Sequence, residues 1–254
     1  MKLKIDKINK TFVNNKVEHK VLEDVCIDIE EGEFISLLGP SGCGKTTLLT
    51  IIGGFTKADS GNIFLDGQKV EKPGVDRAFI FQNYALFPWK TVKENVEFPM
   101  KQLKVPKEER EKKLKQLLEM SHLNGKEHMY PNNLSGGMKQ RVALIRALAC
   151  NPKVLLMDEP LGAVDYQMRQ NLQEELENIW LKNEITAIMV THDVDEAVYL
   201  SDRVIVMSRD RGKIIENLKI DLDRPRQRES SEYNEYKKML TAKLSQCYVG
   251  DKLE

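Results

Sequence analysis

The chain has 254 residues, of which 41% are hydrophobic and 31% are charged, with 39 basic and 39 acidic side chains. This composition excludes a disordered, collagen-like or low-complexity protein. The length predicts either one large domain or one domain that carries an inserted subdomain. Because the formal net charge is zero, no overall field draws the chain to nucleic acid or to an acidic membrane surface.

The cysteines and the apolar segments are typical of a cytosolic chain. Cys26, Cys43, Cys150 and Cys247 lie far apart, without the C-x-x-C spacing of a zinc or redox site, and we expect reduced thiols. The N-terminal residues lack the apolar core of a signal peptide. No segment approaches the ~20 apolar residues that cross a bilayer. A membrane-spanning partner would therefore be another chain.

The N-terminal part of the chain, residues 2–29, predicts a small antiparallel sheet. Charged and aliphatic residues alternate here, as they do in a sheet with one buried face. Two strand-like segments, Leu3–Ile8 and Val25–Ile29, flank a polar region, Asn14–Lys20. We expect this polar region to form the turn.

From Phe34 onward, short aliphatic segments alternate with helical patterns. The expected strands are Phe34–Leu38, Gly61–Leu65, Ala78–Phe81, Val154–Met157, Ile185–Val190 and Arg203–Met207. Helical patterns follow the first and fourth strands, at Lys45–Ile52 and Tyr166–Lys182. The apolar face of the second helix consists of Met168, Leu172, Leu176, Ile179 and Trp180. The alternation predicts an α/β fold with a mostly parallel sheet that is covered on both faces.

Strand signals stop between Pro88 and Cys150, and helical signals replace them. Pro106 is placed to begin a charged helix. The apolar stripe of that helix consists of Leu114, Leu117 and Leu118. We therefore expect residues 88–150 to form an inserted helical subdomain, and residues 1–87 and 151–220 to form a core with an antiparallel β-subdomain.

The C-terminal tail, residues 221–254, is expected to be helical. Past the segment Arg224-Pro225-Arg226, its remaining residues are mostly polar. The residues that keep helical spacing beyond it are Tyr233, Tyr236, Leu240, Leu244 and Cys247. This pattern indicates a terminal helix that packs on the body of the protein.

A complete phosphate-loop motif, G-x-x-x-x-G-K-[ST], lies between the first aliphatic strand and the helix that follows it. Glycines allow successive backbone N–H groups to turn inward, toward the positive end of the helix dipole. Lys45 supplies a charge for the β- and γ-phosphates, and Thr46 a hydroxyl ligand for Mg²⁺. The predicted nucleotide-binding residues are Gly39, Pro40, Ser41, Gly42, Cys43, Gly44, Lys45, Thr46 and Thr47.

Cys43 lies inside the phosphate loop and allows two interpretations. A nearby lysine and a helix N-terminus lower the pKa of a thiol, which predicts a reactive cysteine. Alternatively, a small side chain simply fits this place in the loop.

Carboxylates follow the strand Val154–Met157 directly. In a parallel sheet, ligands bind at the carboxyl edge of the strands. Asp158 is placed to reach Mg²⁺, and Glu159 to accept a proton from an attacking water. Glu159 would otherwise be a turn carboxylate ahead of Pro160. His192 follows the next core strand and is expected to contact the γ-phosphate, although a lone histidine is more often structural.

A second anion-binding motif is Leu134-Ser135-Gly136-Gly137-Met138-Lys139-Gln140-Arg141. Ser135 is a good N-cap, and Gly136-Gly137 expose backbone N–H groups at the head of a helix. Taken alone, these residues also fit an ordinary capped helix.

With the phosphate loop and the Val154–Glu159 strand, this segment resembles the signature of the ATP-binding subunit of an ABC transporter. The likeness covers about Leu3–Leu218. It implies a P-loop NTPase core with ATP and Mg²⁺ as ligands, Gln82 as the Q-loop glutamine that acts in catalysis and binds the metal, and His192 as the switch histidine. Gly162–Asp165 would be the D-loop, with Asp165 at the nucleotide. Met138 and Val164 depart mildly from the usual residues.

The resemblance also implies a head-to-tail dimer. In it, Ser135, Gly136 and Gly137 of one copy close over the γ-phosphate that Lys45 of the other copy holds. Adenine is expected to stack on an aromatic ahead of the phosphate loop, and Phe12 is the best match, unless it packs in the sheet.

The aromatic segment Gln82–Trp89 begins at the Q-loop glutamine. In the family, a groove here takes the coupling helix of a membrane-spanning subunit, whereas Phe87 and Trp89 could instead belong to the core of the insert. The sequence thus predicts the ATPase motor of an importer at the cytoplasmic face of the membrane, with two separate permease subunits and, indirectly, a solute-binding protein. The alternative is a soluble ABC ATPase that acts on nucleic acid or ribosomes, which the neutral charge disfavours.

Three short segments point to a subgroup of importers. Leu86–Trp89, Thr191–Ala197 and Arg224–Arg226 look similar to the nitrate, sulfonate and taurine import group. The transported molecule does not touch this subunit, so its residues do not encode the substrate.

Overall fold

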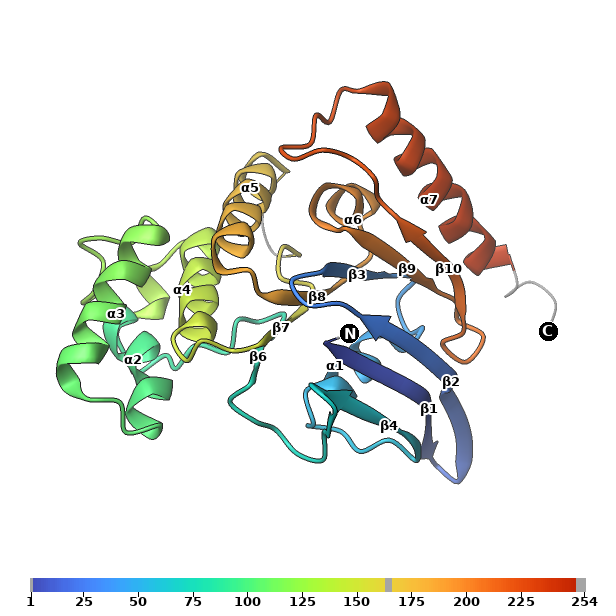
Figure 1. Cartoon of the computed structure of the whole chain (residues 1–254), viewed down its shortest axis with the longest axis horizontal. Coiled ribbons are helices and arrows are strands. Elements are labelled where there is room, and N and C mark those ends of the chain that lie inside the picture. Colours follow the sequence, from blue (N-terminus) through green and yellow to red (C-terminus); the bar gives the residue numbers. More distant parts are fainter. Residues whose placement is uncertain (1, 163–165, 250–254) are drawn as a thin grey trace. The chain divides into compact units, whose positions relative to one another are not determined.

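The computed structural model describes residues 2–162 and 166–249, which divide into two compact units (Figure 1). The first unit consists of Met1–Gly74 and Thr186–Glu254, and the second of Val75–Ile185. The elements of the first unit are β1 (Leu3–Asn14), β2 (Val17–Ile29), β3 (Phe34–Leu38), α1 (Lys45–Ile52), β4 (Ser60–Leu65), β5 (Gln68–Lys69), β8 (Thr186–Thr191), α6 (Val194–Leu200), β9 (Arg203–Met207), β10 (Ile214–Lys219) and α7 (Ser231–Val249). Those of the second are β6 (Arg77–Ile80), α2 (Val92–Gln102), α3 (Lys107–Met120), the 3-10 turn η1 (Pro131–Asn133), α4 (Gly136–Leu148), β7 (Val154–Asp158) and α5 (Tyr166–Asn183).

The first unit contains the expected antiparallel sheet, with strand order β2-β1-β4-β5. The polar region expected as a turn, residues 14–20, was predicted too long. Only Asn15 and Lys16 lie between β1 and β2, and both have positive φ, at 49° and 67°. Two successive residues with positive φ make a tight hairpin whose twist matches that of its strands. The remaining polar residues therefore extend the ladder, with Val13 opposite Glu18.

The other strands of the first unit lie in the order β10-β9-β3-β8. β3 runs parallel to both β8 and β9, and β10 closes the edge in antiparallel fashion. All five residues of β3 are buried, as expected for a strand with both faces covered. α6 packs against β3 and β8, and α1 packs against β8. The carboxyl ends of β3 and β8 therefore point the same way.

The second unit combines a parallel strand pair, β6 and β7, with helices. α2 packs against α3 and α4, and α4 packs against β6. α3 begins directly after Pro106, as predicted, and its buried residues are Leu114, Leu117 and Leu118. The buried face of α5 contains Leu172, Leu176, Ile179 and Trp180; the side chain of Met168 lies outside the described residues. The six expected strands of the two units agree with the observed ones within one residue at each end, whereas β5 and β10 were not predicted.

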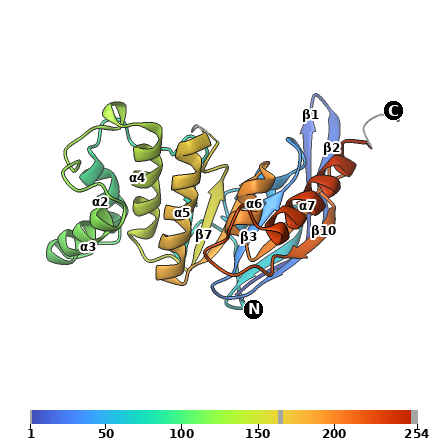
Figure 2. The ribbon, with the colours of Figure 1, turned by 90° about the horizontal axis from the view of Figure 1, so that it is seen from above.

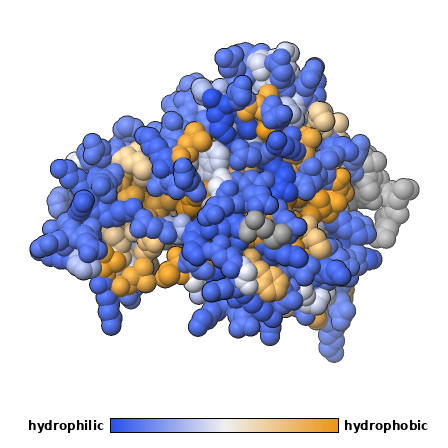
Figure 3. Space-filling view, viewed as in Figure 1, coloured by the Kyte–Doolittle hydropathy of each residue, from blue (hydrophilic) through white to orange (hydrophobic). Residues whose placement is uncertain are grey.

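The tail forms the expected terminal helix. α7 runs alongside α6 and packs against it and β9 (Figures 1 and 2). Tyr233 and Leu240 are fully buried, and Cys247 nearly so. Among the described residues, no helix is both long and apolar enough to cross a bilayer. The face seen in Figure 3 is mostly hydrophilic, with hydrophobic residues in separate patches.

Candidate functional site

The phosphate loop joins β3 to α1 in the first unit, and close packing requires two of its glycines, Gly39 and Gly44. A Cβ on Gly39 would lie 2.5 Å from the Met207 carbonyl oxygen and 2.8 Å from Cys43 Sγ. Gly44, the N-cap of α1, has φ 99°, and a Cβ there would lie 2.8 Å from Leu22 Cδ2. These contacts leave no room for a side chain. The backbone of the loop is thus held against β9 and β2.

Lys45, the first residue of α1, has its ammonium group folded over the loop. Its Nζ donates to the carbonyl oxygens of Gly39, at 2.7 Å, and Pro40, at 2.9 Å, and the residue is only 5% exposed. Among the residues that the structure describes, no carboxylate pairs with this ammonium. A buried charge without a counter-charge is costly. The site therefore fits an anionic ligand.

The first turn of α1 adds donors at the same place. The first α-helical bond of α1 runs from Leu48 N to Gly44 O at 2.8 Å. The amides of Lys45, Thr46 and Thr47 precede it, so they have no intrahelical acceptor. The Thr46 side chain is exposed beside them. This geometry suits a phosphate, with a hydroxyl in reach of its metal ion.

The Cys43 thiol is buried rather than poised for reaction. It is 1% exposed, and burial raises its pKa by more than the nearby Lys45 charge lowers it. The expectation of a lowered thiol pKa is therefore wrong, because loss of hydration outweighs the charge of Lys45. The alternative, a small side chain that fits the loop, agrees with the structure.

His192 also belongs to the first unit and follows β8. Its side chain is exposed at the carboxyl end of that strand, the edge where ligands bind in parallel sheets. Thr191 Oγ1 donates to Glu196 Oε2 at 2.6 Å and accepts from Asp193 N at 3.0 Å. Both neighbours of His192 are thus fixed to the start of α6.

Phe12, the candidate adenine platform, does not pack into the core. It lies on β1, opposite His19 on β2, and is 43% exposed. Lys10 Nζ lies 5.2 Å from the centre of its ring. An exposed aromatic face with a cation nearby is open to a stacked base.

In the second unit, Gln82 and Glu159 are brought together. Gln82 Nε2 donates to Glu159 Oε2 at 3.2 Å, across 77 residues of sequence. Asp158 is the last residue of β7, and Glu159 follows it with φ 45°. Positive φ is strained for glutamate, and such strain clusters at functional sites.

The signature segment forms the start of α4, as predicted. Ser135 is the N-cap, and its Oγ accepts from Met138 N at 3.3 Å. Ser135 is exposed, and the amides of Gly136 and Gly137 lie in the first turn of the helix. The second unit therefore presents its own helix N-terminus to an anion. Asp165, also predicted at the nucleotide, lies outside the described residues.

Asn95, which was not predicted as a functional residue, holds the aromatic segment that follows Gln82. It is fully buried in α2. Its Nδ2 donates to the carbonyl oxygens of Phe87, Lys90 and Thr91 at 3.0–3.2 Å, and its Oδ1 accepts from Phe87 N at 2.9 Å. A polar residue on the buried face of an amphipathic helix was the available signal.

Arg146 holds the same segment from α4. Its two Nη atoms donate to the carbonyl oxygens of Ala85, at 2.6 Å, and Tyr84, at 2.8 Å. Tyr84 and Ala85 both have positive φ, at 61° and 43°. The guanidinium therefore fixes a backbone conformation that L-residues rarely adopt unaided.

The aromatic side chains of this segment differ in exposure. Trp89 is 70% exposed, so it does not belong to the core of the second unit. Phe87 is partly buried, with its ring centre 4.7 Å from that of Phe98 and 5.7 Å from that of Trp89. Phe87 thus packs against Trp89, whose exposed ring is available for contact with another molecule.

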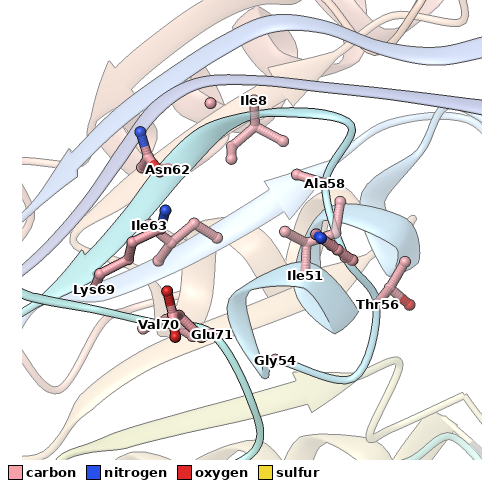
Figure 4. A pocket seen from close by; sticks show the side chains of 12 residues that line it. Ile8, Ile51, Gly54, Thr56, Ala58, Asn62, Ile63, Lys69, Val70 and Glu71 are labelled. Atoms are coloured by element: carbon pink, nitrogen blue, oxygen red, sulfur yellow. The ribbon is translucent and has the colours of Figure 1, made fainter.

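A pocket of about 430 Å³ lies at the far end of α1 from the phosphate loop, where Ile51 and Gly54 line it (Figure 4). None of the nucleotide-binding, catalytic or metal-binding residues predicted from the sequence lines it. Its charged side chains, Lys57, Lys69 and Glu71, are exposed. The pocket therefore does not belong to the site described here.

Comparison with known proteins identifies the family. A family model described as "ABC transporter" matches residues 22–162, more than half of the chain. The chain belongs to the ABC transporter family. It is an ABC ATPase, as the sequence predicts.

Several ABC proteins match nearly the whole chain. An uncharacterized ABC transporter ATP-binding protein of Methanocaldococcus jannaschii is 49% identical over 94% of this chain and 90% of that protein. The nitrate import ATP-binding protein of Synechococcus elongatus is 44% identical over 90% of this chain and 84% of that protein. The aliphatic sulfonates import ATP-binding protein of Bacillus cereus is 44% identical over 94% of each.

A solved ABC cassette shares the fold. This dimeric structure, described as a post-hydrolysis state bound to ADP and Pi, aligns with a TM-score of 0.75 at 34% identity and covers 86% of this chain and 98% of that one. The predicted fold, a P-loop NTPase of the ABC type with an N-terminal antiparallel sheet and added helices, is confirmed.

Replacing Asn95 with alanine should lower the free energy of unfolding by about 2 kcal/mol, because buried backbone groups of the Phe87–Thr91 segment lose their partner. Asn95→Asp should be similarly destabilising, since it keeps the shape but loses the Nδ2 donors. Urea unfolding measures both. The control, Asn124→Ala, removes an exposed asparagine of the same unit and should change little; equal stability of all variants would contradict the bracing role.

Cys43 should react slowly with iodoacetamide at pH 8, because its raised pKa leaves little thiolate and its burial blocks access. Exposed Cys26 should be alkylated first. Raising the pH should speed the reaction of Cys43. Peptide mass spectrometry after timed quenching follows each site, and urea should abolish the difference. Preferential labelling of Cys43 in the folded chain would refute its burial.

Proposed function

We propose that this ABC ATPase is the motor subunit of an importer and binds MgATP in a head-to-tail dimer with a second copy. The observation that carries the proposal is the buried Lys45 ammonium, which has carbonyl oxygens but no carboxylate around it among the described residues. A triphosphate supplies the missing negative charge.

The proposed roles follow from the chemistry of each group. Lys45 and the first-turn amides of α1 bind phosphate oxygens, and Thr46, Asp158 and Gln82 serve as ligands of Mg²⁺, directly or through water. Bound Mg²⁺ neutralises charge on the phosphates. Glu159 accepts the proton of the attacking water. The hydrogen bond from Gln82 to Glu159 supports this role, because it ties the base to a residue that we propose as a metal ligand.

The dimer is proposed because the chain has two helix N-termini suited to phosphate, at α1 and α4. One nucleotide needs the loop of α1, so the Ser135–Gly137 segment is left for the nucleotide of a second copy. Exposure of Ser135 supports this arrangement. The dimeric state of the solved relative supports it too. His192 is proposed to contact the γ-phosphate, and Phe12 to stack on adenine.

Import is proposed from the relatives and from one exposed segment. The relatives named for nitrate and for aliphatic sulfonates are import proteins, which favours nitrate, a sulfonate, taurine or a related small organic ligand as the substrate. The Gln82–Trp89 segment, with Trp89 exposed, is proposed to receive a helix of a separate membrane subunit. The chain would then sit at the cytoplasmic face of the membrane, with a solute-binding protein as an indirect partner.

Lys45→Ala should weaken ATP binding at least ~10-fold, because a charge-assisted contact with the phosphates is lost. Glu159→Gln should keep ATP affinity but lower kcat by ~100-fold or more and trap a dimer, since the base is lost and the shape is kept. Calorimetry measures ATP affinity, ATPase assays measure kcat, and light scattering measures the formation of the dimer. Lys57→Ala and Glu184→Gln, at exposed positions, are the controls. Normal turnover of Glu159→Gln would remove it from catalysis.

Trp89→Ala should weaken recovery of a multi-span membrane protein from detergent-solubilised membranes, because a large apolar contact is lost. ATP affinity should stay unchanged. Tyr130→Ala removes another exposed aromatic of the same unit and serves as the control. Recovery of nucleic acid or ribosomes in place of a membrane protein would favour the soluble alternative.

A further inference from the structure

The segment that follows β10 wraps the C-terminal end of α6 with two arginines. Arg226 is 5% exposed, and its Nη1 donates to the carbonyl oxygens of Val198, Tyr199 and Ser201 at 2.6–3.1 Å. Arg224 Nη2 donates to Leu200 O at 2.8 Å. The last carbonyls of a helix have no intrahelical donors, so these arginines supply them.

At the other end of α6, the carboxylate of Asp195 gathers three side chains of the tail. Arg228 Nη1 lies 2.7 Å from Oδ2, and Lys237 Nζ lies 2.8 Å from Oδ1. The hydroxyl of Tyr233, which is fully buried, donates to Oδ1 at 3.1 Å. The Arg228 guanidinium also lies 3.7 Å from the centre of the Tyr199 ring. Charge-assisted bonds of this kind are strong when they are partly buried.

The first turn of α6 in turn holds the loop that carries His192. Asp193 is the N-cap, and its Oδ1 accepts from Asp195 N at 2.7 Å and from Glu196 N at 3.3 Å. Glu196, which is 4% exposed, accepts from Thr191 Oγ1. The residues on both sides of His192 are therefore bonded to the turn that contains Asp195.

α6 has only seven residues, and a helix so short has little stability of its own. Tertiary contacts must set its orientation. The tail is bonded to both of its ends, and α7 packs along it (Figure 2). Residues 30 to 45 positions after His192 thus contact the helix that follows it.

We propose that Asp195, with Arg228, Tyr233 and Lys237 of the tail, forms a positioning clamp for His192. The clamp does not touch the nucleotide; it restricts the backbone around His192 so that the imidazole is already oriented. This inference rests on the proposed contact of His192 with the γ-phosphate. It gives the C-terminal tail a part in the ATPase reaction.

Hydrogen–deuterium exchange of the nucleotide-free chain tests the clamp without reference to activity. In Arg228→Gln and Asp195→Asn, the amides of residues 191–200 should exchange about tenfold faster, because local opening costs less. The control is Lys238→Gln, an exposed lysine next to Lys237 on α7, and it should match the unaltered chain. Arg228→Lys should retain most of the protection of these amides against exchange. Exchange in Arg228→Gln equal to the control would overturn the inference.

ATPase rates test whether the clamp acts through His192. At a temperature where all variants are folded, Arg228→Gln should lower kcat about tenfold and leave KM for ATP nearly unchanged, since the phosphate loop is not altered. In a His192→Ala background, Arg228→Gln should have no further effect on kcat. An additive loss would overturn the inference.

The two proposals fail in different ways. If the unaltered chain and Lys238→Gln hydrolyse ATP while Arg228→Gln does so equally fast, the clamp alone is wrong. If His192→Ala keeps full activity, the proposed role of His192 is wrong, and with it the functional part of the clamp. The exchange measurement would still report whether the tail restrains residues 191–200.

Discussion

The buried ammonium of Lys45 is the interaction on which the rest of this chain depends. It lies where β3 ends and α1 begins, and its acceptors are the carbonyl oxygens of Gly39 and Pro40 and, more weakly, Cys43 Sγ. Burying a charge against neutral oxygens costs free energy that an anionic ligand can recover. The close approach of the Met207 carbonyl to Gly39 keeps the loop in this shape. Burial of Cys43 follows from the same packing.

A second constraint is backbone conformation that the local sequence does not favour. Glu159, Tyr84 and Ala85 all have positive φ, and each has a partner far along the chain. Gln82 bonds to Glu159, and Arg146 bonds to the carbonyls of Tyr84 and Ala85. Long-range contacts thus stabilise the strained backbone conformations of these three residues.

Much of the site could be predicted because its motifs are local. The phosphate loop and the signature are continuous segments, and each carries its own helix start, Lys45 and Ser135, within a few residues. The strands were predicted from short runs of aliphatic and β-branched residues. Asn95 and Arg146 were not predicted, because they act through hydrogen bonds to backbone groups that come within reach only in the folded chain. The turn between β1 and β2 was predicted too long, since polarity alone does not mark which residues take positive φ.

The sequence by itself determined the α/β class, the family, the phosphate-binding loop and the capped signature helix, because these depend on residue types at fixed short spacings. Only the tertiary structure decided that the Cys43 thiol is buried, that Trp89 is exposed beside Phe87, and that the tail bonds to α6 through Asp195. Exposure and pKa depend on which distant residues pack around a group. That packing is a property of the folded chain as a whole, so no local pattern reports it.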